Sequence, residues 1–228
     1  MGIVANQANV AIGMDAEHQA YGLLRGNVYA HEKHYMAVAE LNADGTETDR
    51  DDPRSVHFGL FENSSTGVRA VGATRLIIKE ADDAGPLPIE EHYPYIFETA
   101  AAPKGSLEVS RLISRHESPH IQRKLKWLLF AVSAAYIVEN QLGPVYGILE
   151  QSIEVALHRE GMPMTTLGEP VLVEEFNSVN VPIRIDMTSL EDRLSSQMPE
   201  LFETCRRIEN GFVLLDASTI ADEAETIG

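Results

Sequence analysis

The stretch SLEVSRLIS at residues 106–114 is followed by SPHIQRKLKWLLFAVSAAYIVEN at 118–140 and by VYGIL at 145–149. The first and third segments are apolar, are bounded by turn residues and predict β-strands. The second predicts a long helix, because Ser118 is a favourable N-cap and Pro119 is favourable at the first helical position. A strand, a helix and a second strand in this order indicate a mixed α/β protein.

The flanking sequence extends this pattern in both directions. Helical spacing of apolar residues, turn clusters and alternating apolar residues were used to place each element. In chain order we expect a helix at 15–30, a loop at 42–55, strands at 56–61 and 70–78 joined around 63–67, irregular chain at 81–105, a helix at 152–159, strands at 171–174 and 181–185, and a helix at 189–207. This order fits an acetyltransferase-like (GNAT) acyltransferase fold, in which a twisted mixed sheet is splayed at a central cleft and flanked by helices.

The 228 residues are enough for one domain, with a core at about 15–208 and a flexible acidic tail at about 217–228. The formal net charge is −17. Such a surface repels nucleic-acid phosphates and anionic lipids, so we expect neither as a partner.

Cellular location is predicted from three features. The single cysteine, Cys205, cannot form an internal disulfide and is interpreted as a small apolar residue of the last helix. The first 14 residues do not resemble a signal peptide, and the apolar run at 127–138 is too short to insert in a membrane. We therefore expect a cytoplasmic protein.

The string His116-Glu117-Ser118-Pro119-His120 matches the H-E-x-x-H zinc signature. That signature needs both histidines on one continuous helix, whereas proline inside the string favours a helix start at this point. No metal site is predicted.

Glu108 is the most informative residue of the strand at 106–114. Alternation places Glu108 and Ser110 on one face and Arg111 on the other. A carboxylate on a central strand is costly to bury without a partner or a function. The residues alone leave two interpretations equally open, a structural salt bridge to Arg75 or Arg25, or a catalytic role.

A basic cluster follows that strand in this acidic chain. Its members are Arg111, Arg115, Arg123, Lys124 and Lys126. They form either a solvated helix start or a docking patch for an acidic partner. Residues 114–124 contain no glycine. A glycine-rich pyrophosphate cradle for coenzyme A is therefore disfavoured, and a donor held by side chains or by a carrier protein is favoured.

Several short motifs together resemble the acyl-homoserine-lactone synthase family. EVSR at 108–111 resembles the E-x-S-R strand of that family, GATR at 72–75 its G-x-x-R strand, and ETDRDD at 47–52 its E-x-D-x-x-D loop. Arg25, Tyr29 and Tyr35 have the spacing of the family's Arg, Phe and Trp, so two of these positions differ in this chain. The aromatic stretch 93–97 is similar to a segment that lines the family's substrate pocket. The likeness extends over roughly residues 20–187.

The resemblance implies an N-acyltransferase that makes an autoinducer of quorum sensing. An acyl group would pass from acyl-carrier protein (or acyl-CoA) to the amine of S-adenosylmethionine, with no tightly bound cofactor. Glu108 would act as the base that accepts the amine's proton, braced by Arg75 and Arg111. The residues implied at the substrates are Arg25, Tyr29, Tyr35, Asp49, Asp52, Tyr93 and Phe97, and those implied for carrier-protein docking are Arg115, Arg123, Lys124 and Lys126. The acyl tail would lie along the stretch 93–97 and along Leu128, Val132 and Leu149, which serve equally well as core.

Three other functions remain open. The related N-acyl amino acid synthases use a free amino acid as the acceptor, which the tyrosines at positions 29 and 35 favour. A non-catalytic lipid- or ligand-binding protein of the same fold is the second alternative. An ordinary coenzyme A acetyltransferase is the third, and the missing glycine loop disfavours it.

Overall fold

The computed structural model of the chain describes residues 14–64, 67–79, 85–174, 177–206 and 211–215. The predicted tail at 217–228 lies outside the described residues. No helix among those described is long and apolar enough to cross a membrane.

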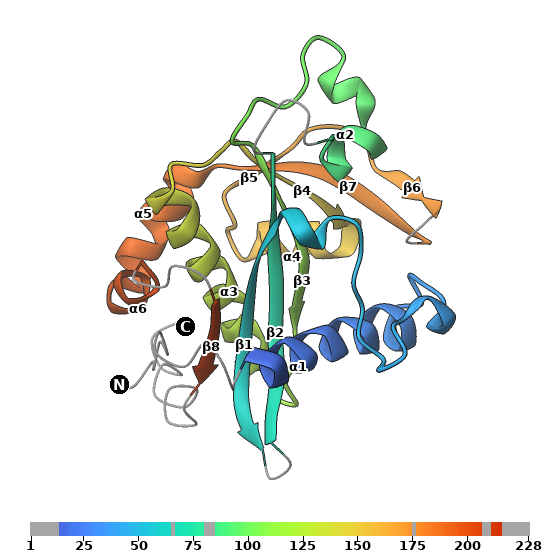
Figure 1. Cartoon of the computed structure of the whole chain (residues 1–228). Helices are drawn as coiled ribbons and strands as arrows, with labels where there is room; N and C mark the ends of the chain where they lie inside the picture. Colours follow the sequence, from blue (N-terminus) through green and yellow to red (C-terminus); the bar gives the residue numbers. More distant parts are fainter. Residues whose placement is uncertain (1–13, 65–66, 80–84, 175–176, 207–210, 216–228) are drawn as a thin grey trace.

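An eight-stranded mixed sheet forms the centre of the fold (Figure 1). The strand order is β5-β7-β4-β3-β2-β1-β8, and β6 also pairs with β7. The β3–β4 and β1–β8 pairs are parallel and the other pairs are antiparallel. The strands are β1 Ser55–Ser64, β2 Gly67–Ile78, β3 Leu107–Ser114, β4 Val145–Glu150, β5 Met164–Thr166, β6 Val171–Val173, β7 Ser178–Ile185 and β8 Gly211–Leu215.

The sheet opens between β3 and β4. Their pairing starts at Leu107 with Val145 and ends at Val109 with Gly147. Beyond that point the described part of β3 pairs with β2 alone, and β4 with β7 alone. The splayed α/β sheet expected from the sequence is thereby confirmed.

A β-bulge in β3 changes which face its side chains occupy. Ala73 pairs with Ile113 and Arg75 with Ser110, so two residues of β3 lie opposite Thr74 alone. One of these two is Arg111, whose φ of 57° lies in the left-handed region. Because the extra residue interrupts the alternation, Arg111 turns to the face that carries Arg75. The prediction that Arg111 and Glu108 lie on different faces of the strand was wrong for this reason.

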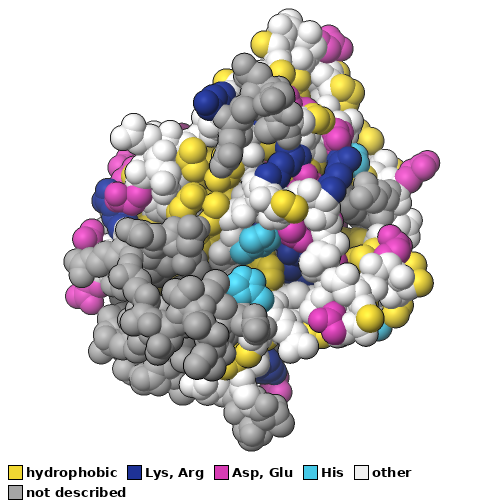
Figure 2. All heavy atoms as spheres, viewed as in Figure 1, with side chains coloured by type: hydrophobic (Ala, Val, Ile, Leu, Met, Phe, Trp, Pro, Cys, Tyr) yellow, Lys and Arg dark blue, Asp and Glu magenta, His cyan; other side chains and the backbone are white. Residues whose placement is uncertain are grey.

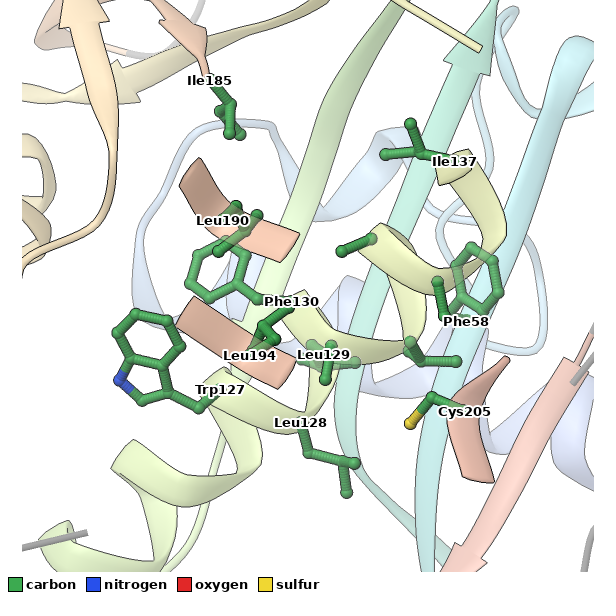
Figure 3. Packing of buried hydrophobic residues seen from close by; sticks show 14 of the residues in the cluster. Phe58, Trp127, Leu128, Leu129, Phe130, Ile137, Ile185, Leu190, Leu194 and Cys205 are labelled. Carbon is green, nitrogen blue, oxygen red and sulfur yellow. The ribbon is translucent and has the colours of Figure 1, made fainter. Parts of the chain in front are cut away.

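One face of the sheet is covered by α3 (Pro119–Glu139), which packs against α5 (Met187–Gln197) and α6 (Pro199–Cys205). Figure 3 shows Leu129 and Phe130 of α3 close to Leu190 and Leu194 of α5 in the buried cluster on this face. Most residues of α3 are buried, among them Leu129, Phe130, Ala131 and Ala134. Cys205 is buried in this core, as expected.

The opposite face carries the N-terminal segment and a short helix. Helix α1 (Met14–Gly26) continues into a π-helical turn (Asn27–Glu32) and packs on β2. Tyr21 of α1 donates a hydrogen bond to the carbonyl of Thr74 at 3.0 Å. Helix α2 (Pro88–His92) lies near β4, and α4 (Gln151–Arg159) directly follows that strand.

Most elements lie where the sequence predicts them, with four differences. The predicted helix at 189–207 is two helices, because Pro199 cannot continue the first one. Strands β5 and β8 were missed, and α2 lies in a segment predicted to be irregular. Ser118 precedes α3 but makes no side-chain capping bond.

Candidate active site

Three arginines and three carboxylates form a closed ring of alternating charge beside the opening of the sheet. Each arginine contacts two carboxylates and each carboxylate contacts two arginines. In order around the ring the residues are Arg25, Glu47, Arg111, Asp49, Arg75 and Asp52, here called the ion-pair ring.

The ring joins four parts of the chain: α1, the loop before β1, β2 through Arg75, and β3. From α1, Arg25 donates through Nη1 to Oδ1 of Asp52 at 2.8 Å and also contacts Glu47. From β3, Arg111 donates through Nη2 to Oε1 of Glu47 at 2.9 Å and to Oδ2 of Asp49 at 2.7 Å. The carboxylates all come from the loop before β1. The ring therefore fixes this loop and α1 to the sheet.

The geometry favours the ionised form of the two aspartates of the ring. Arg25 and Arg75 are 2% and 1% exposed, so their charges need partners. Burial alone would raise the pKa of Asp49, but the hydrogen bonds and charge of Arg75 and the charge of Arg111 lower it well below its ordinary value. Asp52 is lowered in pKa in the same way, chiefly by Arg25. Three positive and three negative charges cancel, which suits a buried cluster.

Glu108 is separate from the ring. Its side chain is buried, and its Oε2 accepts a hydrogen bond of 2.7 Å from the backbone N–H of Ile89. Burial raises the pKa of Glu108 from 4.5 to about 8, although the Ile89 bond and the charge of Arg75 oppose the increase. The salt bridge that the sequence left open is not formed with Arg75 or Arg25, since no described residue is within ion-pair distance of Glu108.

A cavity of about 730 Å³ lies at the opening between β3 and β4. One part of its wall is polar and lies on the face of α1 and α2. Its members include Glu108, Ser110, Arg111, Asp49, Arg75 and Asn180. Figure 2 shows basic, acidic and histidine side chains intermingled near the centre of one face, without a patch of a single sign.

The remaining wall is apolar and belongs to the core on the α3 face. Its members are Leu112, Phe130, Leu149, Ile153, Leu157, Met162, Met164, Ile183 and Ile185. These residues come from both halves of the splayed sheet and from α3 and α4. A polar wall and an apolar wall therefore meet where the two strands diverge.

The structure brings some predicted residues to this cavity and not others. Tyr29 and Tyr35 line it as a stacked pair 5.8 Å apart, and Arg111 lies 4.8 Å from the Tyr29 ring centre. Tyr93 and Phe97 do not line it: Tyr93 is buried against β7, donating to the carbonyl of Asn180 at 2.8 Å. Arg25 and Asp52 belong to the ion-pair ring but do not line the cavity.

The apolar wall also differs from the residues predicted to line the acyl tail. Leu149 lines the cavity, whereas Leu128 and Val132 are core residues of α3. The apolar-wall residues that were not predicted from the sequence lie on β3, α3, α4, β5 and β7 and just before β5, and no local pattern distinguishes them from ordinary core. Glu47 was recognised in the loop motif but was given no role, although it completes the ring.

The predicted basic cluster is dispersed. Arg111 belongs to the ion-pair ring, Arg115 binds Glu32 at 2.7 Å, and Lys126 binds Glu160 at 2.7 Å. Arg123 is exposed and has no ion-pair partner among the described residues. The use of the basic cluster as a docking patch stays a prediction.

The zinc-like string does not form a continuous helix. Helix α3 begins at Pro119, so His116 and Glu117 precede it, and Nδ1 of His116 accepts the N–H of Ser118 at 3.0 Å. In the described part of the chain, no group of three or more His, Cys, Asp or Glu residues is arranged to hold a metal ion.

The fold and cavity define a class: an α/β, acyltransferase-like fold whose sheet opens beside a buried carboxylate. Solved structures share this fold. BjaI, a CoA-dependent acyl-homoserine lactone synthase solved with SAM and isopentyl-CoA, is 19% identical, with 91% of this chain and 90% of BjaI covered at a TM-score of 0.59. LasI, an AHL synthase, is 16% identical, with 76% and 84% covered at 0.55.

An enzyme with a different product has a similar structure. FeeM, an N-acyl amino acid synthase from uncultured soil microbes, is 15% identical, with 78% of this chain and 93% of FeeM covered at a TM-score of 0.50. A scan against protein-family models and a search of curated proteins gave no match. At these identities the likeness shows the fold, and at that level the resemblance read from the sequence motifs is confirmed.

Proposed function

We propose that this chain is an N-acyltransferase that moves a fatty acyl group from a thioester to the amine of S-adenosylmethionine and releases an acyl-homoserine lactone. The observation that carries the proposal is the cavity between β3 and β4, which combines a buried carboxylate at one wall with an apolar pocket at the other. BjaI and LasI, which share the fold, are acyl-homoserine lactone synthases.

The first chemical step is removal of a proton from the acceptor amine. A free α-amino group has a pKa of about 8. Glu108, with a pKa of about 8, is matched to that group and accepts the proton directly or through a water. The neutral amine then attacks the thioester carbonyl, and the tetrahedral intermediate collapses by expelling the thiolate.

The second step forms the lactone. The carboxylate of the acylated acceptor attacks its own γ-carbon, and methylthioadenosine leaves as a neutral thioether. The sulfonium charge is lost in this step. Asp49, at the cavity wall and ionised by Arg75, is suited to face that cation.

The ion-pair ring gives the acceptor site its shape. It ties α1 and the loop before β1 to β2 and β3, and so it sets the position of Tyr29 and Asp49 at the cavity wall. Apart from Asp49, which also faces the acceptor, the ring residues are structural in this sense and their effect on catalysis is indirect.

Mass spectrometry of lipid extracts from cells that express the chain tests the proposal. An acyl-homoserine lactone present with the wild type and absent with Glu108→Gln is the expected result. An N-acyl amino acid in the extract would instead identify a free amino acid as the acceptor and make the chain an N-acyl amino acid synthase, the activity named for FeeM. Extracts without any new acylated product would reject acyl transfer.

Assays with purified acyl-carrier-protein and coenzyme A thioesters of the same acyl chain identify the donor. We expect the carrier-protein thioester to react, with Arg115, Arg123, Lys124 and Lys126 at its docking surface. Turnover with the coenzyme A thioester alone would remove the carrier protein from the proposal.

A further inference from the structure

Among the described residues, the hydrogen bond to the Glu108 carboxylate comes from α2, and the position of α2 is therefore important for the base. The donor is the backbone N–H of Ile89, at 2.7 Å from Oε2 of Glu108. The position of a backbone N–H is fixed by the position of the helix to which it belongs. Ile89 and Leu87 are buried in an apolar cluster with Ile77, which gives α2 a general location on the sheet. Apolar contact is not directional, so it does not by itself set the direction of an N–H group.

A buried ion pair supplies the directional contacts. Nζ of Lys79, at the end of β2, lies 2.8 Å from Oε1 and 2.9 Å from Oε2 of Glu90, the residue next to Ile89. The two side chains are 7% and 8% exposed. Lys79 is itself fixed, because its backbone N–H donates to Ser106 and its carbonyl accepts from Gly105.

Glu90 also accepts two backbone hydrogen bonds. Its Oε2 accepts the N–H of Leu87 at 2.8 Å, and its Oε1 accepts the N–H of Ala102 at 2.9 Å. One carboxylate therefore connects the end of β2, the start of α2 and the chain that leads into β3. Burial alone would raise the pKa of Glu90, but Lys79 and these N–H groups lower it, so the pair is ionised.

We propose that the Lys79–Glu90 pair is a positioning device for the base: it holds α2 so that the Ile89 N–H binds Glu108 and stabilises the ionised carboxylate. A buried ion pair adds little net stability compared with apolar residues of the same size, which leaves its directional contacts as its main effect. The inference rests on the proposed role of Glu108 as a base.

The charged and titratable groups around Glu108 define what the test must hold constant. Arg75 on β2, and Asp51 and Arg54 before β1, act on it through their charge. Tyr146 pairs with it from β4, and Glu91 and His92 of α2 line the same cavity. None of these residues is itself replaced by substitutions at positions 79 and 90.

The double variant Lys79→Met/Glu90→Gln is the direct test. It removes one positive and one negative charge, so the net charge near Glu108 is unchanged and no buried charge loses its partner. Any change at Glu108 then reports the Ile89 hydrogen bond. We expect the pKa of Glu108 to rise by about one unit, since each backbone donor stabilises the carboxylate by roughly that amount.

Two measurements follow this shift. Carbon-13 NMR titration of labelled glutamate side chains, with the Glu108 signal assigned from its absence in Glu108→Gln, gives the pKa without turnover. The pH profile of kcat should move by the same amount, so that kcat falls about tenfold near pH 7 and recovers near pH 9, while KM stays within about twofold. A purely structural defect would lower kcat at every pH. Lys79→Arg, which keeps the pair, should retain the wild-type profile.

The matched control is Arg69→Met/Glu62→Gln, which removes an exposed arginine–glutamate pair between β1 and β2. It should leave the Glu108 titration unchanged. An unshifted Glu108 pKa in the folded Lys79→Met/Glu90→Gln variant would overturn the inference, as would a uniform loss of kcat. Should that variant not fold, Lys79→Gln/Glu90→Gln, which also removes one charge of each sign and keeps polar side chains at both positions, gives the same test with a smaller shift. Full activity of Glu108→Gln would instead overturn the proposed function, whatever the NMR shows.

Discussion

Replacing Glu108 by glutamine tests the proposed base through both activity and stability. The side chain keeps its size but cannot accept the amine proton. We expect Glu108→Gln to fold and to lose most acyl transfer, by about 10²- to 10⁴-fold in kcat. In the wild type kcat/KM should rise with pH up to about 8, where Glu108 becomes ionised.

The same substitution has a predictable effect on stability. The pKa of Glu108 is raised from 4.5 to about 8, so the folded state binds the proton more tightly than the unfolded state. Its contribution to stability is fully present below about pH 4.5 and is lost as the pH rises to about 8. Each pKa unit corresponds to about 1.4 kcal/mol, which gives a loss of about 3 kcal/mol between pH 5 and pH 8.

Urea unfolding at several pH values, together with a thioester-release assay, measures both effects. The wild-type free energy of unfolding should fall relative to that of Glu108→Gln by about 3 kcal/mol from pH 5 to pH 8. Taking the difference between the two proteins cancels the other titrating groups. Glu98→Gln, an exposed carboxylate, is the control and should behave as wild type. Parallel stability curves would refute the raised pKa, and near-normal turnover would remove Glu108 from the mechanism.

Three further predictions concern the ring, the tail site and the donor. Arg25→Met should destabilise the fold by about 3–5 kcal/mol, because it removes one of the two arginine partners of buried Glu47 and of Asp52; an unfolding midpoint equal to wild type would contradict a structural ring. Met164→Trp should lower kcat/KM for long acyl donors by about tenfold or more and spare short ones, because it fills the apolar wall; equal losses across chain lengths would argue against a tail site there. Arg123→Glu should raise the KM for a carrier-bound donor at low salt and lose that effect at high salt, and a KM unchanged at low salt would exclude the predicted docking surface.

The sequence by itself determined most of the element order and five of the six residues of the ion-pair ring. The strand at β3, the start of α3 and the strand at β4 follow from signals within a few residues: apolar runs bounded by turn residues, and Ser118 followed by Pro119. Arg25, Asp49, Asp52, Arg75 and Arg111 were identified from short motifs. Such local signals can be recognised in the sequence because they depend only on neighbouring residues along the chain.

Only the tertiary structure decided how these residues act. The closure of the ring through Glu47, the turn of Arg111 at the bulge and the raised pKa of Glu108 all depend on groups brought together from α1, β2, β3 and α2. The apolar wall combines β3, α4, β5 and β7, and the Lys79–Glu90 pair joins β2 to α2. Burial and hydrogen-bond partners are properties of packing in space, so no spacing along the chain encodes them.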